Sequence, residues 1–151
     1  MVALNCDRYD LDVVPMLEFP HMTGQTAQPK EKKLRILIVE DHTPTRMAMS
    51  RLIRQAGAEV TTARDGEEGL GYLLTQRFDV LLTDLRMPKM DGFELLQHCQ
   101  QLPDTHRPQR VIAISGEYEA SALHGQPNQV QFLAKPFNLD HLLNMLGGKP
   151  N

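Results

Sequence analysis

The sequence has few cysteines, no long apolar run and no secretory signal, and each of these shortages narrows the class of protein. Its 2 cysteines, Cys6 and Cys99, lie far apart in the chain. Because Cys99 falls on the apolar side of an expected helix, we expect a reduced core thiol there and no disulfide. No apolar run approaches the roughly 20 residues that a membrane helix needs. Residues 1–20 lack the basic start and compact apolar stretch of a signal peptide, so we expect a cytoplasmic protein without membrane insertion.

The sequence also lacks an excess of basic residues. Its formal net charge is -3 and no basic stripe is present, so we expect no direct contact with nucleic acid. The hydrophobic content of 41% and charged content of 23% are typical of a globular protein that can bury a core without disulfides. A chain of 151 residues with no internal repeat favours one domain and a tail.

Residues 1–33 differ in composition from the rest of the chain. They contain three prolines, a polar stretch at 23–26 and a charge run at 30–33, and neither a helical nor a strand period persists. We therefore expect an N-terminal extension that is mostly disordered, followed by a folded domain over residues 34–147. The apolar segment 13–19 has three open interpretations: a docking motif, the remnant of a preceding domain, or vector-derived sequence.

From Leu34 onward, apolar segments of strand and helix type alternate. Strands are expected at residues 34–39, 59–63, 79–83, 111–114 and 130–134. A helix is expected after each strand, five in all, and the fourth is a short one at about 117–124. This alternation predicts an α/β fold with a doubly wound five-stranded parallel sheet and right-handed crossovers. In such sheets ligands bind at the carboxyl edge of the strands.

Capping residues and apolar periodicity predict the helix boundaries and the buried faces. Thr43 is the expected cap of the first helix, with Pro44 in its first position and Gly57 ending it. Asp65 and Asp91 are each followed three residues later by glutamate, which predicts two capping boxes. Asn138 is the expected cap of the last helix. The expected buried stripes are Met49, Leu52, Ile53 and Ala56; Leu70, Leu73, Leu74 and Phe78; Leu95, Leu96, Cys99 and Leu102; and Leu139, Leu142, Leu143 and Leu146.

Polar side chains stand at the ends of four expected strands. They are Glu40 and Asp41 after the first, Asp84 after the third, Ser115 after the fourth and Lys135 after the fifth. Packed carboxylates repel one another unless a cation joins them, and Mg²⁺ prefers such oxygen ligands. With the charge neutralised, a carboxylate such as Asp84 can accept a phosphoryl group, whose oxygens Lys135 and Ser115 can bind. Each residue alone is compatible with an ordinary cap, turn or loop, but their joint placement favours one site.

These residues resemble the receiver domain of bacterial two-component response regulators. The resemblance covers residues 34–146. It rests on the motifs Ile38-Val39-Glu40-Asp41, Asp84-Leu85-Arg86-Met87-Pro88-Lys89-Met90-Asp91-Gly92, Ile114-Ser115-Gly116 and Lys135-Pro136-Phe137. It implies a flavodoxin-like fold with strand order 2-1-3-4-5. It further implies that Asp84 is the phosphoacceptor and that Asp41, Asp84 and the Arg86 backbone carbonyl bind Mg²⁺, with Glu40 assisting through water.

The resemblance also implies a function and a conformational switch. Ser115 and Lys135 would contact the phosphoryl group, and Ser115 and Phe132 would be the switch residues. A cis Lys135-Pro136 bond is implied as well. The protein would be a signalling switch in a two-component system or phosphorelay. It would accept a phosphoryl group from a sensor histidine kinase or histidine phosphotransfer protein and act on a downstream protein target. Apart from its own phosphotransfer and autodephosphorylation, no enzymatic activity is implied.

The sequence departs from the family pattern in three places. Ser115 replaces the commoner threonine, which should keep the hydroxyl contact. The segment between Ser115 and Phe132 is short and contains Gly125 and Pro127, so we expect a stunted fourth helix. No output domain follows residue 146, so we expect neither DNA binding nor second-messenger synthesis.

Other functions fit the sequence less well, with one exception. A receiver domain from a hybrid histidine kinase, with residues 1–33 as a linker, is not distinguished from a stand-alone regulator. A hydrolase of the haloacid dehalogenase type needs a second acid two residues after the nucleophile, where Arg86 stands. A flavodoxin-like flavoprotein needs a phosphate loop rich in serine, threonine and glycine after the first strand, where Glu40 and Asp41 stand. A degenerate receiver is disfavoured because every site group is present.

Overall fold

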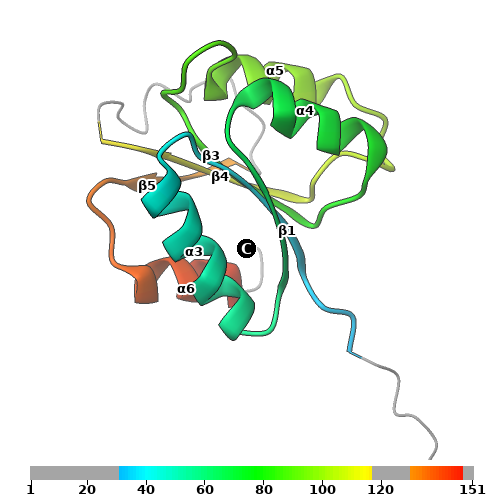
Figure 1. Cartoon of the computed structure of the whole chain (residues 1–151). Coiled ribbons are helices and arrows are strands. Elements are labelled where there is room, and N and C mark those ends of the chain that lie inside the picture. Colours follow the sequence, from blue (N-terminus) through cyan, green and yellow to red (C-terminus); the bar gives the residue numbers. More distant parts are fainter. Residues whose placement is uncertain (1–30, 117–129, 148–151) are drawn as a thin grey trace, which may run out of the picture. The chain divides into compact units, whose positions relative to one another are not determined.

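The computed structural model describes residues 31–116 and 130–147. Within these residues, five parallel strands form one sheet in the order β2-β1-β3-β4-β5 (Figure 1). The predicted doubly wound fold and its strand order are therefore confirmed. β3 lies in the middle of the sheet between β1 and β4, so the carboxyl end of β3 is flanked by strand ends on both sides.

The described elements follow the expected alternation closely. The strands are β1 (Arg35–Val39), β2 (Glu59–Ala63), β3 (Val80–Asp84), β4 (Arg110–Ser115) and β5 (Val130–Ala134). The helices are α3 (Thr43–Gln55), α4 (Gly66–Thr75), α5 (Gly92–Gln100) and α6 (Leu139–Gly147). The short helix expected at 117–124 and the extension expected at 1–33, except its last three residues, lie outside the described residues. Across the described part of the chain, no helix has the length and hydrophobicity needed to cross a bilayer.

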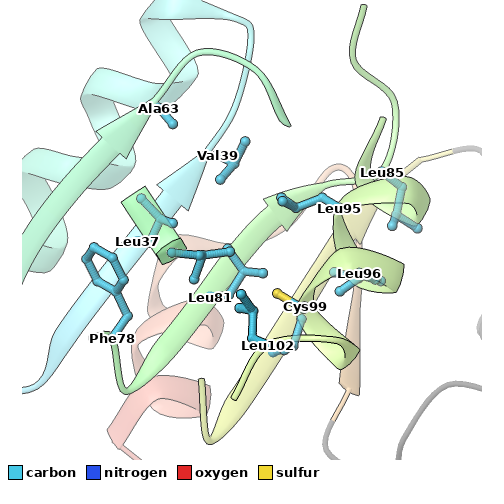
Figure 2. Close-up of a cluster of buried hydrophobic side chains, with 13 residues drawn as sticks. Leu37, Val39, Ala63, Phe78, Leu81, Leu85, Leu95, Leu96, Cys99 and Leu102 are labelled. Carbon is cyan, nitrogen blue, oxygen red and sulfur yellow. The ribbon is translucent and has the colours of Figure 1, made fainter. Parts of the chain in front are cut away.

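Two apolar clusters cover the two faces of the sheet because successive residues of a strand point to opposite sides. Leu37, Leu81 and Ala113 belong to the cluster under α4 and α5, which we call the α4/α5 layer (Figure 2). Ile38, Leu82 and Ile112 belong to the cluster under α3 and α6, the α3/α6 layer. Figure 1 shows these two helix pairs on opposite sides of the sheet. Every residue of β3 is buried, as both of its faces are covered.

The expected buried stripes are partly correct. Leu95, Leu96, Cys99 and Leu102 are all buried, and Cys99 is a free thiol as predicted. Ala56 and Leu139 are exposed, and Leu74 has 59% of its surface exposed, so their expected burial is wrong. Ala56 is the C-cap of α3 and lies beyond its packed turns. α4 turns Gly66, Gly69 and Leu73 toward the interior, which leaves Leu74 on its outer side.

The helix starts show how local hydrogen bonds override simple capping rules. Asp91 forms the predicted reciprocal capping box with Glu94. Asp65 caps α4 through the Glu68 amide, but the Glu68 carboxylate accepts a hydrogen bond from the Arg64 amide, one residue before the expected donor. The cap predicted at Thr43 is wrong, because α3 begins at Thr43 and its N-cap is His42. The carbonyl of His42 accepts from the Arg46 amide at 2.9 Å, which starts the helix one residue early.

Candidate functional site

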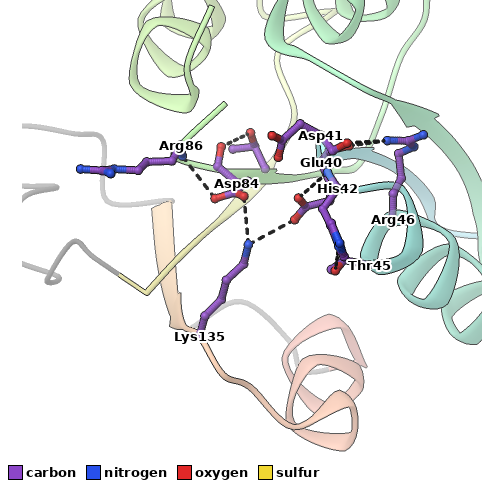
Figure 3. A network of polar contacts seen from close by, with 9 residues as sticks. Glu40, Asp41, His42, Thr45, Arg46, Asp84, Arg86 and Lys135 are labelled. Carbon is purple, nitrogen blue, oxygen red and sulfur yellow. Dashed lines mark hydrogen bonds and ion pairs between the residues drawn. The ribbon is translucent and has the colours of Figure 1, made fainter. Parts of the chain in front are cut away.

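Three carboxylates meet at the carboxyl edge of the sheet. Glu40 and Asp41 directly follow β1, and Asp84 is the last residue of β3 (Figure 3). Each can contribute one carboxylate oxygen to a group in which all three atoms lie within 4.8 Å of one another. Glu40 is 1% exposed and Asp84 is 6% exposed, whereas Asp41 is exposed. The site therefore has two buried acids at its base and one acid at its rim.

Lys135 supplies the positive charge that faces these acids. It follows β5, and its amide donates to the Ser115 carbonyl at 3.3 Å, which ties the end of β5 to the end of β4. Its Nζ atom lies 2.9 Å from Asp84 Oδ2 and 3.4 Å from Glu40 Oε2 (Figure 3). The Lys135-Pro136 peptide bond is cis, as the resemblance implied.

The charges at the site are not balanced. Burial raises the pKa of Glu40 to about 7. A hydrogen bond from the His42 amide opposes this shift, the Asp84 charge adds to it, and the Lys135 charge opposes it. Burial alone would lower the pKa of Lys135, but the hydrogen bond to Asp84 and the charge of Glu40 raise it. Glu40 and Asp84 share the ammonium group of Lys135, and Asp41 adds a third carboxylate nearby. The excess negative charge with its oxygen donors fits a divalent cation such as Mg²⁺.

The loop between β3 and α5 forms one wall of the site. Asp84 Oδ1 accepts a hydrogen bond from the Arg86 amide at 3.2 Å, which orients the carboxylate, while the Arg86 side chain is exposed. An open cleft of about 450 Å³ adjoins this loop. It is lined by Asp41, Leu85, Arg86, Met87, Pro88 and Asp91. Asp41 is the member of the carboxylate cluster that faces this cleft.

Ser115 and Phe132 lie on the α4/α5 side of the sheet. Ser115 ends β4 and is buried, and strand alternation puts it on the same face as Ala113. Phe132 lies opposite Ala113 in the register of β4 and β5, is half-buried, and packs on the same layer. The structure thus places both predicted switch residues on one face, with Phe132 two residues before the Ala134 that pairs with Ser115.

Two residues of the site were missed by the sequence analysis. The His42 amide donates to Glu40 Oε1 at 3.0 Å, and Arg46 Nη1 donates to the carbonyl oxygens of Glu40 and Asp41 at 2.7 and 3.4 Å (Figure 3). Arg46 therefore holds the backbone of the acidic loop. One feature of the sequence could have indicated this role. Arg46 lies in the first turn of α3, where a positive charge interacts unfavourably with the helix dipole, so its presence suggests a compensating contact.

Comparison with known proteins gives one consistent family. The sequence profile of the response regulator receiver domain matches residues 36–147. The chain is 31% identical over 113 residues to a probable chemotaxis protein CheY from Rhizobium etli, covering 74% of this chain and 88% of that protein. Other curated relatives are longer. The chain spans 12% of a gliding motility regulatory protein from Myxococcus xanthus and 23% of the DNA-binding transcriptional regulator NtrC from Klebsiella pneumoniae.

Solved structures agree with the sequence comparison. Chemotaxis protein CheY4 of Vibrio cholerae is 30% identical with a TM-score of 0.68, and the match covers 76% of this chain and 96% of that one. The receiver domain of sensor histidine kinase PA1611 from Pseudomonas aeruginosa is 27% identical with a TM-score of 0.64, over 76% and 94% of the two chains. That structure has a magnesium ion coordinated in its active site cleft.

Proposed function

The chain belongs to the response regulator receiver domain family, and on that premise we propose that it is a signalling switch controlled by phosphorylation of Asp84. One observation carries the proposal. The Asp84 carboxylate ends the central strand, is held by the Lys135 ammonium group at 2.9 Å and lies within reach of the Glu40 and Asp41 carboxylates. A buried acid between a cation and further acids has the groups that phosphoryl transfer to a carboxylate requires.

In the proposed reaction, an Asp84 carboxylate oxygen attacks the phosphorus of a phosphohistidine. The bond between phosphorus and the imidazole nitrogen breaks, and an acyl phosphate forms on Asp84. Lys135 is positioned to pair with one phosphoryl oxygen, because its ammonium group already contacts Asp84. Ser115 can donate a hydrogen bond to another oxygen. We also propose that the same site hydrolyses the acyl phosphate, which makes the switch reversible.

We propose that Asp41, Asp84 and the Arg86 backbone carbonyl hold Mg²⁺, with Glu40 assisting through water. A bound Mg²⁺ would neutralise charge on the transferring phosphoryl group. The three carboxylates fit this role because their oxygens cluster within 4.8 Å, while Lys135 contacts only Glu40 and Asp84 among them. Arg46 and His42 would keep the acidic loop in place, as they bind its carbonyl and carboxylate oxygens.

We further propose that Ser115 and Phe132 pass the signal from Asp84 to the surface near β5. Movement of the Ser115 hydroxyl toward the phosphoryl group would free space on the face where Phe132 is half-buried. New charged contacts of this kind bias a two-state element. The partners would be a histidine kinase or histidine phosphotransfer protein upstream and a protein target downstream, in the cytoplasm.

A second possibility concerns the context of the domain. Residues 34–147 would form the receiver, and residues 1–33 would be an extension or a linker from a hybrid histidine kinase. The similarity to the receiver of sensor histidine kinase PA1611 favours this alternative as much as the similarity to CheY proteins favours a stand-alone regulator. The sequence of the complete gene distinguishes them.

The phosphoacceptor assignment is tested by labelling with acetyl phosphate and Mg²⁺, followed by intact mass measurement. Asp84→Asn is expected to abolish labelling. Asp104→Asn is the matched control, since its side chain is 91% exposed on the segment between α5 and β4, and it should label like the wild type. Stoichiometric labelling of the Asp84→Asn protein would refute the assignment.

A further inference from the structure

The first turn of α4 packs against the backbone of the loop between β3 and α5. We call this loop, residues 85–91, the acceptor loop. It contains the Arg86 backbone carbonyl. A Cβ atom on Gly66 would lie 2.5 Å from the Met90 carbonyl oxygen and 2.9 Å from the Met90 Cβ and Cγ atoms. Those separations are too short for a side chain, so the close approach needs glycine at position 66. The spacing between α4 and the loop is therefore set by that residue.

A second contact joins the same two segments at the tip of the loop. Lys89 has a φ of 64°, a left-handed conformation that is unfavourable for a residue with a Cβ atom. Its Nζ atom lies 3.9 Å from Asp65 Oδ2, while Asp65 Oδ1 caps α4 by accepting from the Glu68 amide at 2.8 Å. A strained backbone persists where the surroundings hold it. The ion pair with Asp65, the N-cap of α4, is one of the contacts that hold Lys89 in this conformation.

The far end of the acceptor loop returns to the phosphoacceptor. The Gly92 amide donates to the Leu85 carbonyl at 3.0 Å, and a Cβ atom on Gly92 would collide with the Asp84 carbonyl oxygen and the Leu85 Cα atom. Within the loop, the Arg86 amide donates to Asp84 Oδ1. The loop is thus fixed to β3 at both ends, and its outer part, Lys89 and Met90, rests on α4.

We propose that the Asp65–Gly66 turn of α4 is a positioning element for the metal site. By holding the outer part of the acceptor loop, it fixes the Arg86 carbonyl beside Asp84 and thereby sets the affinity for Mg²⁺. The inference rests on the proposed function, because it requires the Asp41–Asp84 metal site. Gly66 acts through the loop and is a positioning residue. Replacing Gly66 should weaken Mg²⁺ binding by more than a change in the stability of α4 alone would cause.

The test compares two identical substitutions on one helix. Gly66→Ala forces the loop away from α4, whereas a Cβ atom on Gly71 meets nothing within 4 Å, so Gly71→Ala is the matched control. The Mg²⁺ dissociation constant is measured by isothermal titration calorimetry. Amide hydrogen exchange of residues 86–91 is measured in metal-free protein. Gly66→Ala should weaken Mg²⁺ binding by about tenfold, as loss of a contact that orients a ligand does, and should speed exchange of the loop. Gly71→Ala should match the wild type in both measurements.

The inference is overturned if folded Gly66→Ala binds Mg²⁺ within about twofold of Gly71→Ala and its loop exchanges at the same rate. If Gly66→Ala does not fold, Lys89→Gly decides. That change removes the contact with Asp65 and relieves the left-handed strain, so it should keep the melting temperature and weaken Mg²⁺ binding. Unchanged binding in Lys89→Gly overturns the inference. A wild-type protein that neither binds Mg²⁺ nor is labelled by acetyl phosphate would instead refute the proposed function.

Discussion

Replacing Glu40 by glutamine should remove a pH dependence from the stability of the metal-free protein. Glu40 is almost fully buried, and its pKa is raised from 4.5 to about 7, mainly by burial. Below about pH 4.5, Glu40 is protonated in both the folded and the unfolded states. Between about pH 4.5 and 7 the folded protein keeps a proton that the unfolded chain has released. The stability that this proton contributes is therefore fully present below pH 4.5 and is lost as the pH rises through 7.

The size of the effect follows from the difference between the two pKa values. At 1.36 kcal/mol per pKa unit, a rise from 4.5 to about 7 corresponds to about 3 kcal/mol. Other groups also titrate in this range, so the useful quantity is the difference between the wild type and Glu40→Gln. Glutamine has nearly the same shape and does not titrate. The free energy of unfolding of the wild type, minus that of the variant, should fall by about 3 kcal/mol from pH 4.5 to 8.

The assay is urea unfolding followed by far-ultraviolet circular dichroism at several pH values, with a chelator present. The sequence has no tryptophan, so fluorescence offers little. Saturating Mg²⁺ should shrink the fall, because a bound cation stabilises the ionised carboxylate. A difference that stays flat, or that rises with pH, would show that burial does not hold Glu40 protonated and would refute the reasoning.

Three further predictions concern the core, the switch and the extension. Leu81→Ala should lower the free energy of unfolding by about 2–5 kcal/mol because Leu81 is fully buried, and urea unfolding measures it against the exposed control Leu74→Ala. Phe132→Ala should keep labelling at Asp84 but confine the amide shifts caused by beryllofluoride to the site; shifts that reach β5 as in the wild type would contradict the proposed switch. Deleting residues 1–33 should leave the melting temperature nearly unchanged, and a fall of many degrees would show that residues 13–19 pack on the domain.

Most of the fold could be predicted because buried parallel strands and capped helices leave strong local signals. The range expected for β2 matches the structure, and the capping box of Asp91 formed as expected. The predictions were wrong where tertiary packing determines which side of a helix is buried. Leu74 has the spacing of a core residue, yet α4 turns Gly66 and Gly69 inward because they allow close approach to the acceptor loop and to the sheet. The buried face of a helix is predicted from the spacing of its hydrophobic residues, and glycine has no side chain that would contribute to that pattern.

The site was predictable to the extent that strand ends define it. The rule that carboxyl ends of parallel strands share one edge placed Glu40, Asp41, Asp84 and Lys135 together, and their proximity is confirmed. Their roles in phosphoryl transfer stay predictions. Arg46 was missed because it binds backbone carbonyls, and the position of a carbonyl depends on loop geometry that spacing alone does not reveal.

The assignment of alternate strand residues to two apolar layers has a consequence for protein engineering. The sheet separates the two apolar clusters, since Leu81 and Leu82 are neighbours in sequence yet belong to different clusters. Ser115 and Phe132 both belong to the α4/α5 side, so the α3/α6 layer offers room for redesign that leaves their surroundings intact. Substitutions confined to opposite layers and well separated in space should combine additively. A stabilised version of the domain can therefore be sought by repacking Ile53 against Leu142 and their neighbours, without altering the side of the sheet on which signalling is proposed to occur.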